Sequence, residues 1–226
     1  MSQHDKSVFA FKQFVIAQDQ CAMKVGTDGV LLGAWAAGGR HVLDAGTGTG
    51  IIALMMAQRY GEATVTAIDI DEAAVCQAVR NVADSPFAKR VSVCCEALQQ
   101  HDGVYDAIVS NPPFFIDSLK APDAQRSMAR HASTLTYAEL MRAAWRLLAD
   151  DGELSVVVPF DYRRRMEDEA TFVGFFASRV CGVRTAEGKP VRRYLLAFRK
   201  HPCTTVYEKM TVGDDEYRRL TGAFYL

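Results

Sequence analysis

Apolar and polar positions follow two rhythms along this chain, and the change from one to the other marks the predicted elements. Short apolar runs rich in Val and Ile are typical of buried strands, and they occur at residues 41–44, 63–69, 90–95, 105–110 and 154–159. Between and after these runs, apolar residues recur with helical spacing at residues 51–57, 72–85, 137–148 and 162–177. The pattern therefore predicts strands and helices in alternation.

Two of these helices carry clear terminal signals. Asp71 stands where an N-cap is expected and Pro86 ends that segment. Its core face is predicted at Val75, Ala78, Val79 and Val82. Thr136 and Glu139 have the spacing of a capping box that opens another helix, and Gly152 is expected just past the end of that helix.

The two ends of the chain depart from this alternation. Residues 30–36 form an apolar run typical of a buried helix, with Thr27 or Asp28 as its cap. Near the other end, residues 179–184 and 192–199 flank a Gly-Pro turn, which predicts an antiparallel hairpin at the edge of the sheet.

Alternating strands and helices followed by an antiparallel pair predict a three-layer α/β/α sandwich with a mostly parallel, mixed sheet. The chain has 226 residues, so we expect a single domain that spans residues 1–226.

Composition excludes several classes of protein. No apolar run reaches the length of about 18 residues that a membrane span requires, and the first residues lack the apolar core of a signal peptide, so we expect a cytoplasmic protein without a membrane partner. The net charge of −1 argues against a protein coated in positive charge. The six cysteines contain no C-x-x-C pair, so we expect buried free thiols and no metal site.

A glycine-rich loop follows the first predicted strand. Glycines at 46, 48 and 50 come directly after Asp44 and precede a helix, which is the arrangement used to hold nucleotide cofactors. A dinucleotide fingerprint would need its third glycine at position 51, and that residue is Ile51. The spacing therefore favours an adenosine cofactor other than NAD, approached closely by the backbone of the loop.

Two acidic residues stand at the carboxyl ends of the next two predicted strands. Asp69 ends the second strand, where an acid can accept hydrogen bonds from a ribose diol. Glu96 follows the third strand, where a polar side chain can meet an adenine edge. Asp69 does not by itself distinguish NAD from other adenosine cofactors, and Glu96 also has a simpler interpretation as a solvated loop acid.

The fourth predicted strand runs into Asn111, Pro112, Pro113 and Phe114. Two prolines fix the backbone and remove two N–H donors, which leaves the Asn111 amide carbonyl and the Pro112 carbonyl as acceptors beside the aromatic face of Phe114. This set suits a planar ring that bears an exocyclic NH2 group. The long polar stretch that follows carries Phe115, Arg126, Arg130 and His131, which we interpret as candidate contacts to a nucleic acid or as solvated loop residues.

Over nearly its whole length the chain resembles the class I S-adenosylmethionine-dependent methyltransferases. The run from Asp44 to Gly50 matches their cofactor loop, Asp69 matches their ribose acid, and the run from Asn111 to Phe114 matches the members that methylate amino or amide nitrogens. Residues 19–35, Asn111 to Phe115 and the terminal residues 224–226 are similar to the bacterial valine-tRNA adenine N6-methyltransferases, which modify adenine 37 beside the anticodon.

The resemblance implies a Rossmann-like fold, a tRNA substrate, and S-adenosylmethionine as the cofactor. It implies catalytic roles for Asn111, Pro112 and Phe114. It implies that the cofactor is bound by Lys24, Thr27, Asp44, Gly46, Gly48, Gly50, Asp69, Ile70, Glu96, Ala97 and Asn111. Residues 1–36 would pack over the site, residues 37–226 would form the catalytic core, and a monomer is expected.

Four alternatives stay open at this point. The same acceptors would suit a methyltransferase of guanine N2 in ribosomal RNA, or of a glutamine amide in a protein release factor. A non-catalytic RNA-binding module and a nucleotide-binding oxidoreductase belong to other classes. The intact Asn111 motif argues against the former, and Ile51 argues against the latter.

Overall fold

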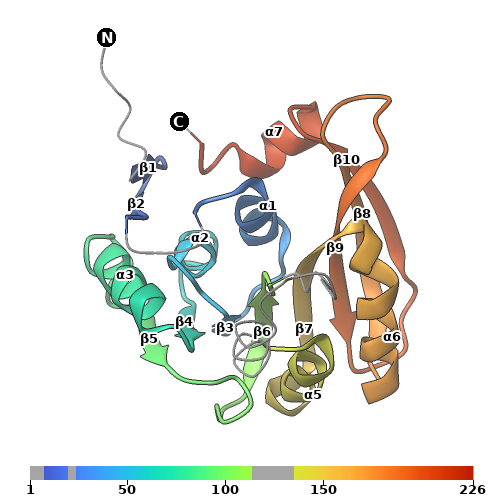
Figure 1. Ribbon diagram of the computed structural model, residues 1–226, viewed down its shortest axis with the longest axis horizontal. Coiled ribbons are helices and arrows are strands. Elements are labelled where there is room, and N and C mark those ends of the chain that lie inside the picture. The colour runs from blue at the N-terminus through green and yellow to red at the C-terminus, as the bar shows by residue number, and fades with distance from the viewer. Residues whose placement is uncertain (1–7, 20–23, 114–134, 226) are drawn as a thin grey trace, which may run out of the picture.

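The computed structural model describes residues 8–19, 24–113 and 135–225. Their main sheet has eight strands in the order β10-β8-β9-β7-β6-β3-β4-β5, and β1 and β2 form a separate antiparallel pair (Figure 1). The strands are β1 (Val8–Ala10), β2 (Val15–Ala17), β3 (His41–Ala45), β4 (Thr64–Asp69), β5 (Val91–Cys95), β6 (Tyr105–Ser110), β7 (Leu148–Pro159), β8 (Phe176–Arg184), β9 (Val191–Arg199) and β10 (Val206–Thr211).

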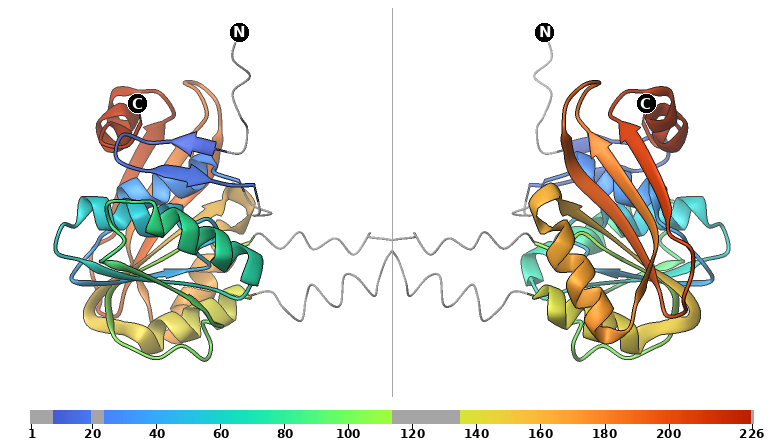
Figure 2. Two further views of the ribbon diagram at one scale, coloured as in Figure 1. Left: turned by 90° about the vertical axis from the view of Figure 1, so that its left-hand side faces the viewer. Right: turned by 90° about the vertical axis from the view of Figure 1, so that its right-hand side faces the viewer.

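Helices cover both faces of this sheet, which confirms the predicted three-layer sandwich (Figure 1). They are α1 (Thr27–Trp35), α2 (Ile51–Arg59), α3 (Glu72–Ala83), α5 (Tyr137–Leu147), the 3₁₀ turn η1 (Phe160–Tyr162), α6 (Arg163–Val173) and α7 (Asp215–Thr221). α1, α2, α3 and α7 belong to one apolar cluster, and α5 and α6 belong to the other. Figure 2 shows α6 beside β8, the strand that follows it.

Adjacent residues of a strand point to opposite faces of the sheet and pack in different apolar clusters, as expected for a strand that is buried on both faces. In β3, Val42 packs with α2 while Leu43 packs with α5, and in β7, Val157 and Val156 divide in the same way. Strands β5, β4, β3, β6 and β7 pair in parallel, so their carboxyl ends lie along one edge of the sheet. All five predicted strands are confirmed.

The predicted hairpin is confirmed as β8 and β9, which pair antiparallel, and β9 also pairs antiparallel with β7. A further strand, β10, lies outside the hairpin and pairs in parallel with β8. β10 is therefore the outermost strand on this side of the sheet, and the hairpin lies next to it.

The expectation that Gly152 ends a helix was wrong. α5 opens on the predicted capping box, in which Thr136 accepts from the Glu139 N–H, but it stops at Leu147 and β7 begins at the next residue. Gly152 lies inside β7, where an added Cβ would stand 2.9 Å from the Asp106 carbonyl oxygen. The glycine is there because the backbone of β6 approaches closely, which the sequence pattern could not indicate.

The predicted core face of α3 was partly wrong. Asp71 is the N-cap and accepts from the Ala73 N–H at 2.9 Å, as expected, and Ala78 and Val82 are buried. Val79, however, is 47% exposed. Two polar side chains, Gln77 and Asn81, occupy the buried face instead.

The expected cap of α1 was also wrong, because Gly26 is the N-cap and offers no side-chain bond, while Thr27 and Asp28 are already helical. The carboxylate of Asp28 forms an ion pair with Arg193 of β9. Among the cysteines, Cys181 is buried as expected, whereas Cys76, Cys94, Cys95 and Cys203 are exposed, and Cys21 lies outside the described residues.

The first and last described segments of the chain are bonded to each other. The Lys12 ammonium donates to the Gly222 carbonyl at 2.6 Å, across 210 residues, and the Lys12 N–H donates to the Phe224 carbonyl at 2.8 Å. The Trp35 indole N–H donates to Glu208 of β10 at 2.7 Å. The amino-terminal elements are therefore held against the last strand and helix of the chain.

Within residues 8–19, 24–113 and 135–225, no helix combines the length and the apolarity that crossing a bilayer requires.

Asn81 joins β2 to the glycine loop, and its removal is our first prediction. Its amide accepts from the Ala17 N–H at 2.9 Å and donates to the carbonyls of Ala17 and Thr49 at 2.9 and 2.8 Å. Asn81→Ala leaves these partly buried groups unpaired, at about 1–3 kcal/mol each, so we expect the free energy of unfolding to fall by about 3 kcal/mol in urea denaturation. Val79→Ala, on the exposed face of the same helix, is the control and should change it by less than about 0.5 kcal/mol. Equal losses for the two variants would contradict this role of Asn81.

Candidate functional site

The glycine loop occupies the turn between β3 and α2. Gly46, Gly48 and Gly50 have φ values of 77°, 56° and 82°, a left-handed conformation that favours glycine. A Cβ added at Gly46 or Gly48 would meet no described atom within 4 Å, so open space borders the backbone there. At Gly50 it would lie 3.4 Å from Ala78, so the third glycine also lets α2 pack closely on α3.

Asp44 lies beneath this loop and is fully buried. Its Oδ2 accepts from the Thr47 hydroxyl at 2.6 Å and from the Ala53 N–H at 3.0 Å. Its Oδ1 is buried without a hydrogen-bond partner among the described residues. Burial, which removes water from the carboxylate, raises the pKa of Asp44 to about 7. The site thus holds a buried acceptor that a positively charged ligand group would satisfy.

Asp69 links the loop to the next strand end. Its carboxylate accepts from the Gly48 N–H at 2.9 Å and from the Asp71 N–H at 3.0 Å, while its carbonyl accepts from the Glu96 N–H at 3.0 Å. These bonds fix the carboxylate beside the open glycine backbone, and each oxygen keeps a lone pair for a ligand hydroxyl. Ile70, which follows it, is half exposed.

Glu96 is held by two residues that the sequence analysis missed. Its carboxylate contacts Nδ1 of His101 at 2.8 Å, and Nε2 of His101 contacts the Tyr105 hydroxyl at 2.7 Å. His101 is buried, and its ring stacks on that of Tyr105. The only signal in the sequence is the short spacing of the three residues, and it is too common to identify the chain of bonds.

Asn111 stands one strand away from Asp44. Asp44 lies opposite Val109 in the parallel β3–β6 pair, and the Ser110 hydroxyl donates to the Ala45 carbonyl at 2.7 Å, which joins the two strand ends. The Oδ1 of Asn111 is buried and has no hydrogen-bond partner in the described part of the chain. The fold therefore presents two unpaired acceptors, one on each of two neighbouring strands.

The remaining predicted site residues divide into two groups. Thr27 begins α1, whose Gly29 lies against Ile51 at the start of α2, so the first turn of α1 borders the glycine loop. Lys24 is exposed just before that turn, Ala97 follows Glu96, and Pro112, which follows Asn111, is buried. The others lie outside the described residues: Phe114, Phe115, Arg126, Arg130 and His131.

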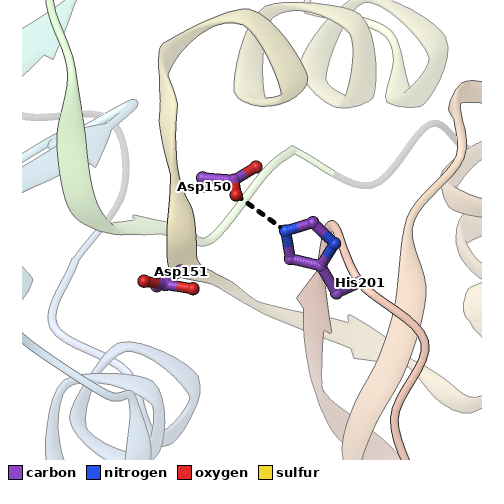
Figure 3. A group of neighbouring side chains, drawn as sticks. All are labelled: Asp150, Asp151 and His201. Carbon is purple, nitrogen blue, oxygen red and sulfur yellow. Dashed lines mark hydrogen bonds and ion pairs between the residues drawn. The ribbon is translucent and has the colours of Figure 1, made fainter.

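One group of potential metal ligands lies elsewhere. Asp150, Asp151 and His201 place one ligand atom each within 4.8 Å of one another, and Nε2 of His201 contacts Asp150 at 2.8 Å (Figure 3). Both aspartates lie near the amino end of β7, opposite the end that adjoins Asn111. All three side chains are exposed, and such surface groups are common without an ion, so we assign no metal here.

These acceptors and the open glycine backbone fit S-adenosylmethionine. The partnerless Asp44 oxygen suits the ammonium of its amino acid part, the open backbone at Gly46 and Gly48 admits a ligand, and Asp69 can accept from a ribose diol.

Comparison with known sequences agrees with this geometry. Residues 25–176 match the family model described as the methyltransferase small domain. A protein of Bacteroides thetaiotaomicron named tRNA1(Val) (adenine(37)-N6)-methyltransferase is 44% identical over 96% of this chain and 97% of its own length. Proteins of the same name from Parabacteroides distasonis and Serratia proteamaculans are 48% and 42% identical, over 86% and 96% of this chain and 84% and 89% of their own.

Solved structures are similar in fold. Atu636 of Agrobacterium tumefaciens, described as a predicted O-methyltransferase, has a TM-score of 0.69 at 15% identity over 87% of this chain and 96% of its own. P. horikoshii TYW2, solved in complex with MeSAdo, has a TM-score of 0.62 at 16% identity over 88% and 74%. Identities this low support the fold alone.

The raised pKa of Asp44 predicts a pH-dependent loss of stability. The unfolded chain loses this proton near pH 4 and the folded chain near pH 7, so stability falls as pH rises between these values. Asp44→Asn keeps the acceptor oxygen but does not ionise. The quantity to compare is the unfolding free energy of the variant minus that of the unchanged protein, measured in urea denaturation. We expect this difference to be about 3 kcal/mol larger at pH 8 than at pH 4.5. The exposed Asp151→Asn is the control, and a difference for Asp44→Asn that is the same at both pH values would overturn the assignment.

Proposed function

We propose, since the chain belongs to the methyltransferase small domain family, that it transfers a methyl group from S-adenosylmethionine to N6 of adenine 37 in a valine tRNA. The observation that carries the proposal is the buried, partnerless Oδ1 of Asn111, one strand away from the buried, partnerless Oδ1 of Asp44. Relatives that carry this activity in their names align with nearly the whole chain, which adds support for adenine as the target.

The cofactor would lie across the carboxyl ends of β3, β4 and β5. Asp44 would bind the cofactor's ammonium group, and Asp69 would accept from its ribose hydroxyls. The backbone of Gly46 and Gly48 would lie against the cofactor. Ile70, Glu96 and Ala97 would surround the adenine, with His101 and Tyr105 holding the Glu96 carboxylate in place. Lys24 and Thr27, at the start of α1, and Gly50, at the end of the glycine loop, would also border the cofactor.

Asn111 and Pro112 would orient the target nitrogen. The lone pair of an adenine amino group is delocalised into the ring, which makes it a poor nucleophile. Acceptors at the Asn111 side chain and the Pro112 carbonyl bind its two hydrogens and favour a pyramidal nitrogen whose lone pair points out of the ring plane. Because positive charge grows on this nitrogen during the reaction, both hydrogen bonds strengthen toward the transition state.

S-adenosylmethionine, when bound, supplies a methyl group on a positively charged sulfur. The chain contributes by holding the acceptor nitrogen in line, which converts a bimolecular encounter into a positioned one. No His or carboxylate adjoins Asn111 in the sequence, so the extra proton on the nitrogen would leave to solvent. Stacking of the flipped-out base on Phe114 remains part of the proposal, although Phe114 lies outside the described residues.

The amino-terminal segment, residues 1–36, would pack over this site while residues 37–226 form the core. Asn81 supports this division because it bonds both Ala17 and Thr49, the latter within the glycine loop. A tRNA substrate would place the activity in the cytoplasm. We propose that the protein acts as a monomer and without a metal ion.

Product analysis tests the function directly. The protein is incubated with unmodified tRNA1(Val) and S-adenosylmethionine labelled in the methyl group, and the digested nucleosides are analysed by mass spectrometry. We expect label in N6-methyladenosine, and none when adenine 37 of the tRNA is replaced by guanine. Label in N2-methylguanosine, or transfer only to ribosomal RNA or a release factor, would contradict the proposed substrate.

Asn111→Ala tests the role of the acceptor oxygen. Loss of one transition-state hydrogen bond typically lowers turnover by about 100-fold or more, and we expect this loss at saturating tRNA. Affinity for S-adenosylmethionine in calorimetry should stay within a few-fold. Asp150→Ala is the control and should retain full turnover, because Asp150 lies near the amino end of β7, at the opposite end of the strands from Asn111. Loss of cofactor binding in Asn111→Ala would instead mean that this side chain mainly builds the cofactor pocket.

A further inference from the structure

An open hollow of about 660 Å³ lies where β7 ends, between η1, the first two turns of α6 and β9. Its aromatic lining is Phe160 and Tyr194, and its charged lining is Asp161, Arg163, Arg164, Glu167 and Asp168. The volume is within the range of small-molecule sites, roughly 300–1,000 Å³. None of these residues belongs to the cofactor and acceptor site described above.

Strand register places the hollow on the catalytic edge of the sheet. Ser110 of β6 lies opposite Val156 of β7, so the end of β7 at Pro159 lies roughly 7 Å beyond the level of Asn111 along the strands. Tyr194 of β9 lies opposite Val158, and only β7 separates β9 from β6, a spacing of about 10 Å. Nucleotides beside a base bound at Asn111 can therefore reach the hollow.

The two aromatic side chains of the hollow lie beside each other in a tilted arrangement. Phe160 is 51% exposed, and its ring centroid lies 6.0 Å from that of Tyr194 with an interplanar angle of 30°. The guanidinium of Arg163 lies 4.5 Å from the Tyr194 centroid and is held there by an ion pair with Glu167 at 2.9 Å. Rings and guanidinium planes arranged in this way are the surfaces on which proteins stack unpaired bases.

Charge distinguishes a base from a phosphate at this position. Two arginines face three carboxylates, and each arginine has an acidic neighbour one turn along α6: Glu167 for Arg163, and Asp168 for Arg164 at 3.9 Å. A phosphate would meet net negative charge here. An uncharged ring with an exocyclic amino group would instead find carboxylate acceptors at the rim.

We propose that this hollow binds an unpaired base of the tRNA anticodon loop, next to the target adenine, by stacking on Phe160. The proposal rests on the proposed function, because it takes the same tRNA as substrate. In this arrangement η1 and β9 hold the RNA nucleotides next to the flipped-out adenine.

Binding of a labelled anticodon stem-loop in the presence of S-adenosylhomocysteine provides the test. Loss of one aromatic stacking partner weakens binding by about 10-fold, and we expect this for Phe160→Ala. Phe172→Ala is the matched control, because Phe172 lies on α6, the helix that follows η1, is 78% exposed and does not line the hollow. Phe160→Trp should restore affinity, and cofactor binding should be unchanged in all three variants.

Abasic substitutions identify the base that is bound. Each loop nucleotide flanking adenine 37 is replaced in turn by an abasic residue, and Phe160→Ala should have no further effect on the one stem-loop that lacks the stacked base. The salt dependence of binding should be the same for Phe160→Ala and the unchanged protein, since no phosphate contact is lost.

Three results would overturn the proposal: unchanged affinity in Phe160→Ala, an equal effect of this variant on every abasic stem-loop, or a smaller salt dependence. Failure here is distinguishable from failure of the proposed function. In the former case the unchanged protein still forms N6-methyladenosine in tRNA, and in the latter it does not.

Discussion

The parallel pairing of β6 with β3 is the constraint on which the rest of the site depends. It brings Asn111 beside the glycine loop although more than sixty residues separate them in the chain. The Ser110 hydroxyl reinforces the alignment by bonding the Ala45 carbonyl, so the two strand ends cannot shift independently. β4 and β7 extend the same edge on either side, which adds Asp69 to one flank and the Phe160 hollow to the other.

Along this edge the protein keeps polar groups that folding alone does not satisfy. A buried acceptor without a partner costs about 1–3 kcal/mol, and both Asp44 and Asn111 retain one among the described residues. The chain tolerates this cost because each group is fixed by its neighbours: Thr47 and Ala53 hold Asp44, and Ser110 holds the start of the Asn111 turn. A ligand that supplies donors to both therefore relieves a deficit already present in the fold.

Sequence patterns predicted what depends on near neighbours in the chain. The Asp71 cap, the capping box of Thr136 and Glu139, the five parallel strands and the β8–β9 hairpin were all confirmed. The resemblance to adenine N6-methyltransferases was confirmed by relatives that align over almost the entire chain. Other features were not predictable. Gly152 is set by the backbone of the distant strand β6. Gln77 and Asn81 take the buried positions of α3 although both are polar, and the five-residue spacing of Glu96 and His101 is too common to indicate that they are in contact.

The bonds between the first and last described segments bear on the order in which the protein folds. Lys12 pairs with Gly222 and Phe224, Trp35 with β10, and Asp28 with β9, so the segment that borders the glycine loop takes several of its partners from strands and a helix far along the chain. Contacts of this sequence separation form slowly, and a chain that emerges amino end first must wait for them. Packing of the amino-terminal segment beside the glycine loop therefore follows synthesis of β9, β10 and α7.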